Sequence, residues 1–184
     1  MDNNNWHDFK GERKEQLLTL CDRQGNPVGQ ATREVCHKGK GKPHLAFLAF
    51  IVDSDGSVVL TRRAKKKSLW ALYWDASVVS HVLPGETPLS AANRRGKEEL
   101  GVDVSFELLG GFYYFALHGK SSENEYCYVL LGTTGGEVIA NPVEIDAVKR
   151  ISFSALLSDS KNSPEKYTPW LILSLAKIDA LKRL

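Results

Sequence analysis

The sequence predicts an α+β fold in which a mixed β-sheet core is flanked by helices. Two observations carry this prediction. Short apolar runs rich in β-branched and aromatic residues recur between turns that contain Gly, Asn or Asp, which is typical of strands. Two other segments, at residues 88–100 and 169–184, carry helix-forming residues and helix-end signals or helical apolar spacing instead. A chain of 184 residues can form one compact domain with a single core.

The first half of the chain predicts two hairpins and a further strand. Each hairpin is a pair of apolar runs joined by a polar turn: residues 15–22 with 27–33, and residues 44–53 with 57–63. The β-branched residues of the segment 74–82 predict the further strand. We expect the first hairpin to be an N-terminal addition to the core sheet.

A helix is expected at residues 88–100 because both of its ends carry suitable signals. Thr87 is suited to cap the N-terminus, and Pro88 occupies the first helical position. Gly101 stands where a glycine commonly ends a helix.

The two faces of this helix differ in character. Small and apolar residues share one face: Leu89, Ala92, Gly96 and Leu100. We expect the charged residues Arg95, Glu98 and Glu99 to point away from the core.

The second half predicts more strands and two more helices. Strands are expected at residues 104–117, 124–133 and 147–153. Gly110 and Gly111 predict a bulge or bend within the first of them. A short helix is expected at residues 152–159 and an amphipathic C-terminal helix at residues 169–184.

Composition argues against several functional classes. The net charge of +2 is too small to predict nucleic-acid binding. No apolar run approaches the roughly 18 residues needed to cross a bilayer, and the polar N-terminus shows no export signal, so we expect a cytoplasmic protein without membrane insertion. The cysteines Cys21, Cys36 and Cys127 lack CxxC spacing, and we expect them to be buried small hydrophobes.

A motif typical of phosphate chemistry lies between Ser80 and Val102. Its spacing, S-x5-E-x7-R-R-G-x-E-E-x-G-V, resembles the Nudix box, G-x5-E-x7-R-E-U-x-E-E-x-G-U, where U is a bulky aliphatic residue. Carboxylates on such a helix can hold Mg²⁺, which neutralises a diphosphate. A solvated helix with ion pairs at i,i+4 would explain the charges but not the whole spacing.

Arg95 departs from this box in a way that bears on chemistry. It replaces a glutamate that usually serves metal or base chemistry in the hydrolases. A guanidinium cannot act as a base, but it can bind a phosphate through two hydrogen bonds. The resemblance therefore implies a Nudix fold, while Arg95 argues against hydrolysis.

Five further residues have side chains that suit Zn²⁺ or Mn²⁺: His37, His44, His81, Glu123 and Glu125. The two glutamates alternate onto one face of a predicted strand, as two ligands of one ion need. The spacing leaves open whether the histidines join them, because a single histidine is more often a surface or core residue than a ligand.

Taken together, these segments resemble the type I isopentenyl-diphosphate isomerases, which use the Nudix fold for isomerisation. The resemblance runs from about Glu15 to the C-terminus and rests on HKGKGKPHLAF, TRRAKKKSLWALYWDASVVSHV, ENEY and YTPWL. It implies an extension at residues 1–14 and a single domain at residues 15–184. It also implies that the three histidines and two glutamates hold Zn²⁺ or Mn²⁺, and that Glu99 helps to hold the Mg²⁺ that accompanies the diphosphate.

The same resemblance implies the substrate-binding and catalytic residues. The positions matched to diphosphate-binding side chains are Arg33, Arg63, Lys67 and Arg95. In the family reaction the terminal alkene carbon is protonated, a tertiary carbocation forms, and the neighbouring methylene loses a proton. On one face of the substrate, Glu125 matches the proton carrier, Tyr113 lies nearby, and Trp170 matches a tryptophan that stabilises the cation.

The match fails on the other face of the substrate. The family has a cysteine at the position of Val79 and a neighbouring asparagine at the position of Ala76. Valine has no proton to exchange, so we expect isomerisation to be impaired. Cys36 or Cys127 could replace the thiol only if the fold brings it to the pocket, and strand alternation places Cys127 on the face of Glu125.

Three functions therefore remain open. The first is metal-dependent isomerisation of isopentenyl diphosphate to dimethylallyl diphosphate. The second is hydrolysis of a prenyl or nucleoside diphosphate by a Nudix hydrolase, which Glu86, Glu98 and Glu99 favour. The third is a non-catalytic protein that binds a diphosphate without turnover. Each takes a small-molecule diphosphate and none requires nucleic acid; we expect a monomer or a weak dimer.

Overall fold

The structure is a computed structural model that describes residue 11 and residues 13–177. Expectations for most of the extension at residues 1–14, and for residues 178–184, lie outside these described residues. Within them, strands assemble into one sheet: β1 (Leu17–Cys21), β2 (Pro27–Thr32), β3 (His44–Asp53), β4 (Val58–Arg63), β5 (Trp74–Asp75), β6 (Val78–His81), β7 (Phe106–His118), β8 (Ser121–Thr134) and β9 (Ile145–Ile151). The helices are α1 (Arg33–His37), α2 (Pro88–Leu100), α3 (Phe153–Asn162), the 3-10 helix η2 (Pro164–Lys166) and α4 (Pro169–Lys177).

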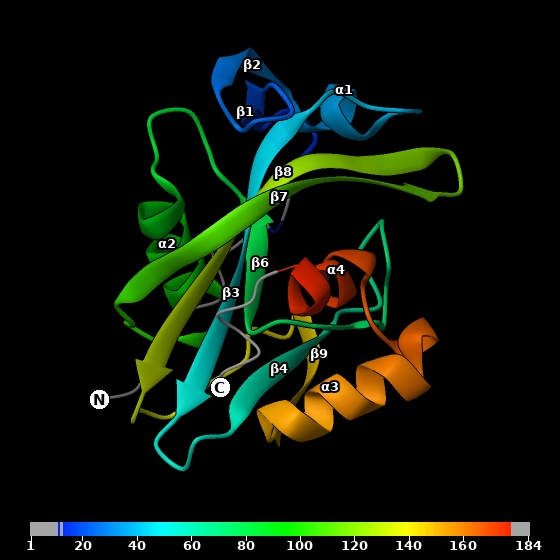
Figure 1. Cartoon of the computed structure of the whole chain (residues 1–184). Coiled ribbons are helices and arrows are strands. Elements are labelled where there is room, and N and C mark those ends of the chain that lie inside the picture. The colour runs from blue at the N-terminus through cyan, green and yellow to red at the C-terminus, as the bar shows by residue number, and fades with distance from the viewer. Residues whose placement is uncertain (1–10, 12, 178–184) are drawn as a thin grey trace.

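Strand β3 is the centre of the sheet. It pairs in parallel with β8 and antiparallel with β6, β4 and β1. Strands β7 and β8 form a long antiparallel hairpin that crosses the molecule (Figure 1). The predicted α+β architecture, with a mixed sheet and an N-terminal hairpin of β1 and β2, is confirmed.

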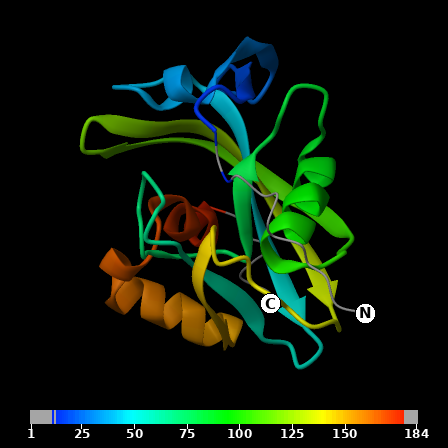
Figure 2. The ribbon, with the colours of Figure 1, turned by 180° about the vertical axis from the view of Figure 1, so that it is seen from behind.

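The two faces of β3 pack against different helices. Alternate residues beginning with Ala46 face a core that includes Phe153 of α3 and Trp170 of α4. The intervening residues, such as Phe47, face a second core that includes Leu100 of α2. Helix α2 therefore lies on one side of the sheet and helices α3 and α4 on the other, as the two opposite views show (Figures 1 and 2).

Helix α2 begins and ends where the sequence predicts. The Thr87 hydroxyl accepts a hydrogen bond from the backbone N–H of Ser90, and Gly101 adopts a φ of 67° at the C-terminus. The prediction for its charged face is wrong for two residues, because Arg95 and Glu99 are each only 5% exposed. Leu89, expected on the core side, is instead exposed.

Other boundaries differ from the predicted ones in ways that matter for the site. The strand expected at residues 74–82 is split into β5 and β6, and the Asp75 carboxylate accepts a hydrogen bond from the backbone N–H of Ala76 at the break. Helix α1 was not predicted. The predicted bulge is confirmed as a register shift between Leu108 and Gly110.

Two expectations from composition can be compared with the structure. The three cysteines are all free and buried, as expected. No helix among residues 13–177 is both long enough and apolar enough to cross a membrane.

Candidate active site

The predicted histidines and glutamates come together at one end of the central strands. His37 ends α1, His44 begins β3 and His81 ends β6, while Glu123 and Glu125 lie near the start of β8. Strand register explains the meeting, because His44 pairs with Glu125 and His81 pairs with Ala46, two residues further along β3. Ligand atoms from all five side chains lie within 4.8 Å of one another.

Each side of this cluster is held by contacts that orient the histidine rings. His37 Nδ1–H donates to the Arg33 carbonyl at 2.7 Å, and His44 Nδ1–H donates to the Lys42 carbonyl at 2.8 Å. Their Nε2 atoms consequently face inward, where Nε2 of His37 lies 2.9 Å from Glu123 Oε2. Burial, together with the cation of Arg33, lowers the pKa of His81 well below its ordinary value, which keeps that imidazole neutral.

The cluster fits a transition metal. Nε2 of His37, Nε2 of His44 and Oε2 of Glu123 are buried, and none of them makes a hydrogen bond of suitable geometry, even though Nε2 of His37 and Oε2 of Glu123 lie close together. Such an arrangement is costly unless another group satisfies these atoms. Imidazoles oriented by carbonyl groups and combined with carboxylates are suitable ligands for Zn²⁺ or Mn²⁺. Among the described residues this is the one group of side chains so arranged.

Metal binding at this cluster is expected to stabilise the fold. Saturating Zn²⁺ or Mn²⁺ should raise the melting temperature of chelator-treated protein by roughly 5–10 °C, because a ligand that binds only the folded state stabilises it. Differential scanning calorimetry measures the shift. His44→Ala should abolish it and His118→Gln, outside the cluster, should retain it; an equal shift in the two variants would contradict the assignment.

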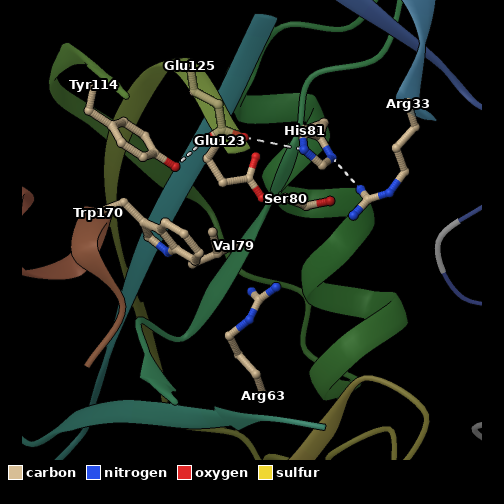
Figure 3. A pocket seen from close by; sticks show the side chains of 9 residues that line it. All are labelled: Arg33, Arg63, Val79, Ser80, His81, Tyr114, Glu123, Glu125 and Trp170. Carbon is tan, nitrogen blue, oxygen red and sulfur yellow. Dashed lines mark hydrogen bonds and ion pairs between the residues drawn. The ribbon is translucent and has the colours of Figure 1, made fainter. Parts of the chain in front are cut away.

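A pocket adjoins the cluster and is shown in Figure 3. Its lining residues are Arg33, Arg63, Val79, Ser80, His81, Tyr114, Glu123, Glu125 and Trp170. The Tyr114 hydroxyl donates a hydrogen bond to Glu125 Oε2, while Glu125 Oε1 lies 3.3 Å from Nε2 of both His44 and His81. Glu125 therefore connects the metal-binding cluster to the pocket. Burial and the neighbouring Glu125 raise the pKa of Tyr114 well above its ordinary value, so its hydroxyl is protonated and can donate.

The structure places Tyr114, and not the expected Tyr113, in this pocket. Tyr113 does not line this pocket, and its hydroxyl donates to Asn124 Oδ1 at 2.8 Å. Tyr114 takes the expected place because it pairs directly with Glu125 across β7 and β8, and paired residues share one face of a sheet. Tyr113 and Tyr114 are adjacent in the sequence, and the register of β7 on β8 determines which of them faces the pocket.

Val79 lines the pocket at the position where the resemblance implies a thiol, and none of the three cysteines is among the lining residues. Cys127 lies on the sheet face of Glu125, as expected, but Ala46 of β3 separates it from His81 and it packs in the core. Its burial raises the pKa of the thiol well above the ordinary value. Cys36 is also fully buried, with Sγ 4.0 Å from the carbonyl of Ala31, and its burial raises the pKa to about 11. Neither cysteine is among the lining residues of the pocket.

A second, smaller cavity adjoins the first through two shared residues, Arg63 and Val79. Its other lining residues are Thr61, Lys67, Asp75, Glu99, Glu144 and Ile145. Lys67 forms an ion pair with Glu144, a carboxylate that sequence reasoning missed. Burial raises the pKa of Glu99 to about 7 despite the nearby cations. Glu99 and Glu144 thus place two carboxylates beside the cations expected to bind a diphosphate.

Arg95 contacts Glu99 and Glu144 but is not a lining residue of either cavity. Its guanidinium donates to Glu99 at 2.5 Å and to Glu98 at 2.7 Å, and lies 3.3 Å from Glu144. These contacts hold together carboxylates that would otherwise repel one another. The expected role of Arg95 in binding a phosphate stays a prediction.

Arg95→Ala is expected to lower the free energy of unfolding by about 3–5 kcal/mol, because it leaves buried carboxylates without their cation. Urea denaturation measures the loss. The matched control is Arg94→Ala, one position away, whose partly exposed ion pairs with Glu86 and Glu98 should contribute no more than about 1 kcal/mol. Equal losses in the two variants would show that Arg95 does not support the carboxylates.

The chain is similar to known proteins over most of its length. A NUDIX domain model matches residues 42–171. An isopentenyl-diphosphate Delta-isomerase of Brevibacterium linens is 31% identical over 169 residues, which cover 90% of this chain and 93% of that protein. A protein of the same name from Paenarthrobacter aurescens is 35% identical over 167 residues, which cover 89% and 90% of the two chains.

Solved structures show the same fold. A Deinococcus radiodurans protein superimposes with a TM-score of 0.70 at 23% identity, covering 91% of this chain and 98% of its own. A MutT protein from Methanosarcina mazei gives a TM-score of 0.64 at 17% identity, covering 80% of this chain and 98% of its own. At these identities the likeness concerns the fold alone.

Proposed function

The chain belongs to the NUDIX family and, within it, to the isopentenyl-diphosphate Delta-isomerases, and we propose that it converts isopentenyl diphosphate to dimethylallyl diphosphate. The observation that carries this proposal is the placement of Glu125. Its carboxylate contacts the histidines with one oxygen and the Tyr114 hydroxyl in the pocket with the other. A carboxylate shared in this way can hold a proton beside an alkene.

The reaction needs a proton delivered to the terminal alkene carbon and a proton removed from the methylene next to the cation. A metal bound at the cluster would supply positive charge that fixes Glu125 and makes its carboxylic acid more acidic. Glu125 and Tyr114 then hold the proton on their side of the pocket. The Trp170 ring stabilises the tertiary cation through its π face.

The cationic side chains supply the site for the diphosphate. Arg63 lines both cavities, Arg33 lines the first and Lys67 lines the second. Glu99 would hold Mg²⁺ on the diphosphate at the second cavity, where oxygen ligands suit that ion. In this proposal the charged end of the substrate lies near α2 and its alkene lies near Glu125 and Trp170.

Val79 favours a second candidate function, a non-catalytic role in binding a diphosphate. Val79 carries no group that exchanges a proton, whereas the reaction uses two faces of the substrate. If the protein isomerises its substrate, a water molecule or another residue has to replace the thiol. Turnover that is slow relative to binding is therefore expected.

NMR spectroscopy of the reaction tests the proposal. Protein loaded with Zn²⁺ or Mn²⁺ is incubated with Mg²⁺ and isopentenyl diphosphate, and the alkene protons and the phosphorus signals are followed together. We expect the alkene signals of dimethylallyl diphosphate with an intact diphosphate. Released phosphate would instead favour a hydrolase, and unchanged substrate that still binds would favour the non-catalytic role.

A further inference from the structure

Asp75 is a buried carboxylate that the proposed reaction does not use. It ends β5, is 2% exposed and lines the second cavity. Both of its oxygens accept hydrogen bonds from the Trp170 indole N–H, at 2.8 and 3.0 Å. Its Oδ2 also accepts a hydrogen bond from Nη1 of Arg63 at 3.2 Å. One anion therefore contacts both a cation and an aromatic ring of the pocket.

The contact with Asp75 determines where the Arg63 guanidinium lies. Its Cζ atom is 5.3 Å from the centroid of the Trp170 ring, within the range of a cation–π interaction. Nε and Nη2 of Arg63 both donate to the Leu69 carbonyl at 3.2 Å. A long side chain held on two sides loses its conformational freedom before a ligand arrives, so less entropy is lost on binding.

The other oxygen of Asp75 has a structural role. Oδ1 accepts hydrogen bonds from the Thr168 hydroxyl and the Ala76 backbone N–H, each at 2.9 Å. An amide oxygen at Oδ1 could accept the same bonds. An amide NH₂ in place of Oδ2 would instead face the N–H groups of Arg63, since both are donors. Asp75→Asn therefore separates the two roles of the carboxylate.

We propose that Asp75 is a positioning residue that holds Arg63 over the Trp170 ring and thereby orients this arginine toward the diphosphate of the substrate. The inference rests on the proposed function, since it assumes that Arg63 binds a diphosphate. Asp75 acts through Arg63 and does not touch the substrate. Its effect must accordingly vanish when the arginine is removed.

Isothermal titration calorimetry with inorganic diphosphate and Mg²⁺ tests this coupling in four proteins: the wild type, Asp75→Asn, Arg63→Gln and the double variant. We expect Asp75→Asn to weaken binding about tenfold, as the loss of a charge-assisted hydrogen bond does. In the Arg63→Gln background the same substitution should change affinity less than twofold. The matched control is Asp146→Asn, which removes the exposed ion pair of the neighbouring Arg62 and should leave affinity unchanged.

Two results would overturn the inference while leaving the proposed function intact. One is wild-type affinity in Asp75→Asn, and the other is a loss that persists in the Arg63→Gln background, which would mark a structural role alone. A wild-type protein that binds no diphosphate overturns the proposed function and this inference together. If Asp75→Asn does not fold, Asp75→Glu is used in the same cycle, because its longer carboxylate keeps the charge but displaces Arg63.

Discussion

A Val79→Cys variant is expected to form dimethylallyl diphosphate about a hundredfold faster than the wild-type protein. A positioned acid or base contributes roughly 10²–10⁴-fold to a proton transfer, and valine contributes none. Val79 lines the same pocket as Glu125 and Trp170, so a thiol there would stand beside the substrate. The rate of product formation by NMR at saturating substrate measures the gain.

The change of side chain at Val79 is small enough to leave the fold intact. Val79 is half-buried and pairs with Leu48 of β3, and replacing it with cysteine is expected to cost no more than about 1.5 kcal/mol. Val79→Ala is the matched control, since it also removes bulk but adds no thiol. Equal rates for the two variants, with substrate binding retained, would show that the absence of a thiol at position 79 does not limit isomerisation.

Glu125→Gln is expected to abolish isomerisation, with a loss of about a thousandfold or more. Glutamine keeps the shape of the side chain and can accept the Tyr114 hydrogen bond, but it carries neither the negative charge nor an exchangeable carboxylic proton. It also weakens the metal-binding cluster by one anionic ligand. Metal content and turnover are therefore measured on the same preparation.

Glu107→Gln serves as the control for this substitution. Glu107 lies on the neighbouring strand β7 and is exposed, so its neutralisation should change neither metal content nor turnover. A Glu125→Gln protein that keeps its metal and loses turnover would place the proton transfer on Glu125. Turnover within a few-fold of the wild type would show that another group carries the proton.

Much of the fold follows from local sequence signals. The bounds of β3 and α2 agree with prediction because an eight-residue apolar run and a capped helix are both strong signals. The sequence predicts the residue types of the candidate metal site and the alternation of its two glutamates, but it is the pairing of β3 with β6 and β8 that brings His44, His81 and Glu125 together. That pairing is long-range, so spacing along the chain could not supply it.

The differences between sequence and structure arise from register and burial. Choosing Tyr114 over Tyr113 requires the exact register of β7 on β8, which depends on the turn that joins them. Arg95 and Glu99 look like a solvated pair on a helical wheel, yet Glu144 from the segment before β9 covers them. Asp75 gives no motif signal, because its partners Trp170 and Thr168 lie more than ninety residues away.

The most direct test of the central claim is isomerisation in D₂O. Metal-loaded protein and Mg²⁺ are incubated with isopentenyl diphosphate, and the product is examined by ¹H and ²H NMR. We expect dimethylallyl diphosphate that carries solvent deuterium in its newly formed methyl group, because protonation of the terminal carbon creates that group. Isopentenyl diphosphate that remains unchanged and undeuterated, although it binds the metal-loaded protein, would contradict isomerisation by this site.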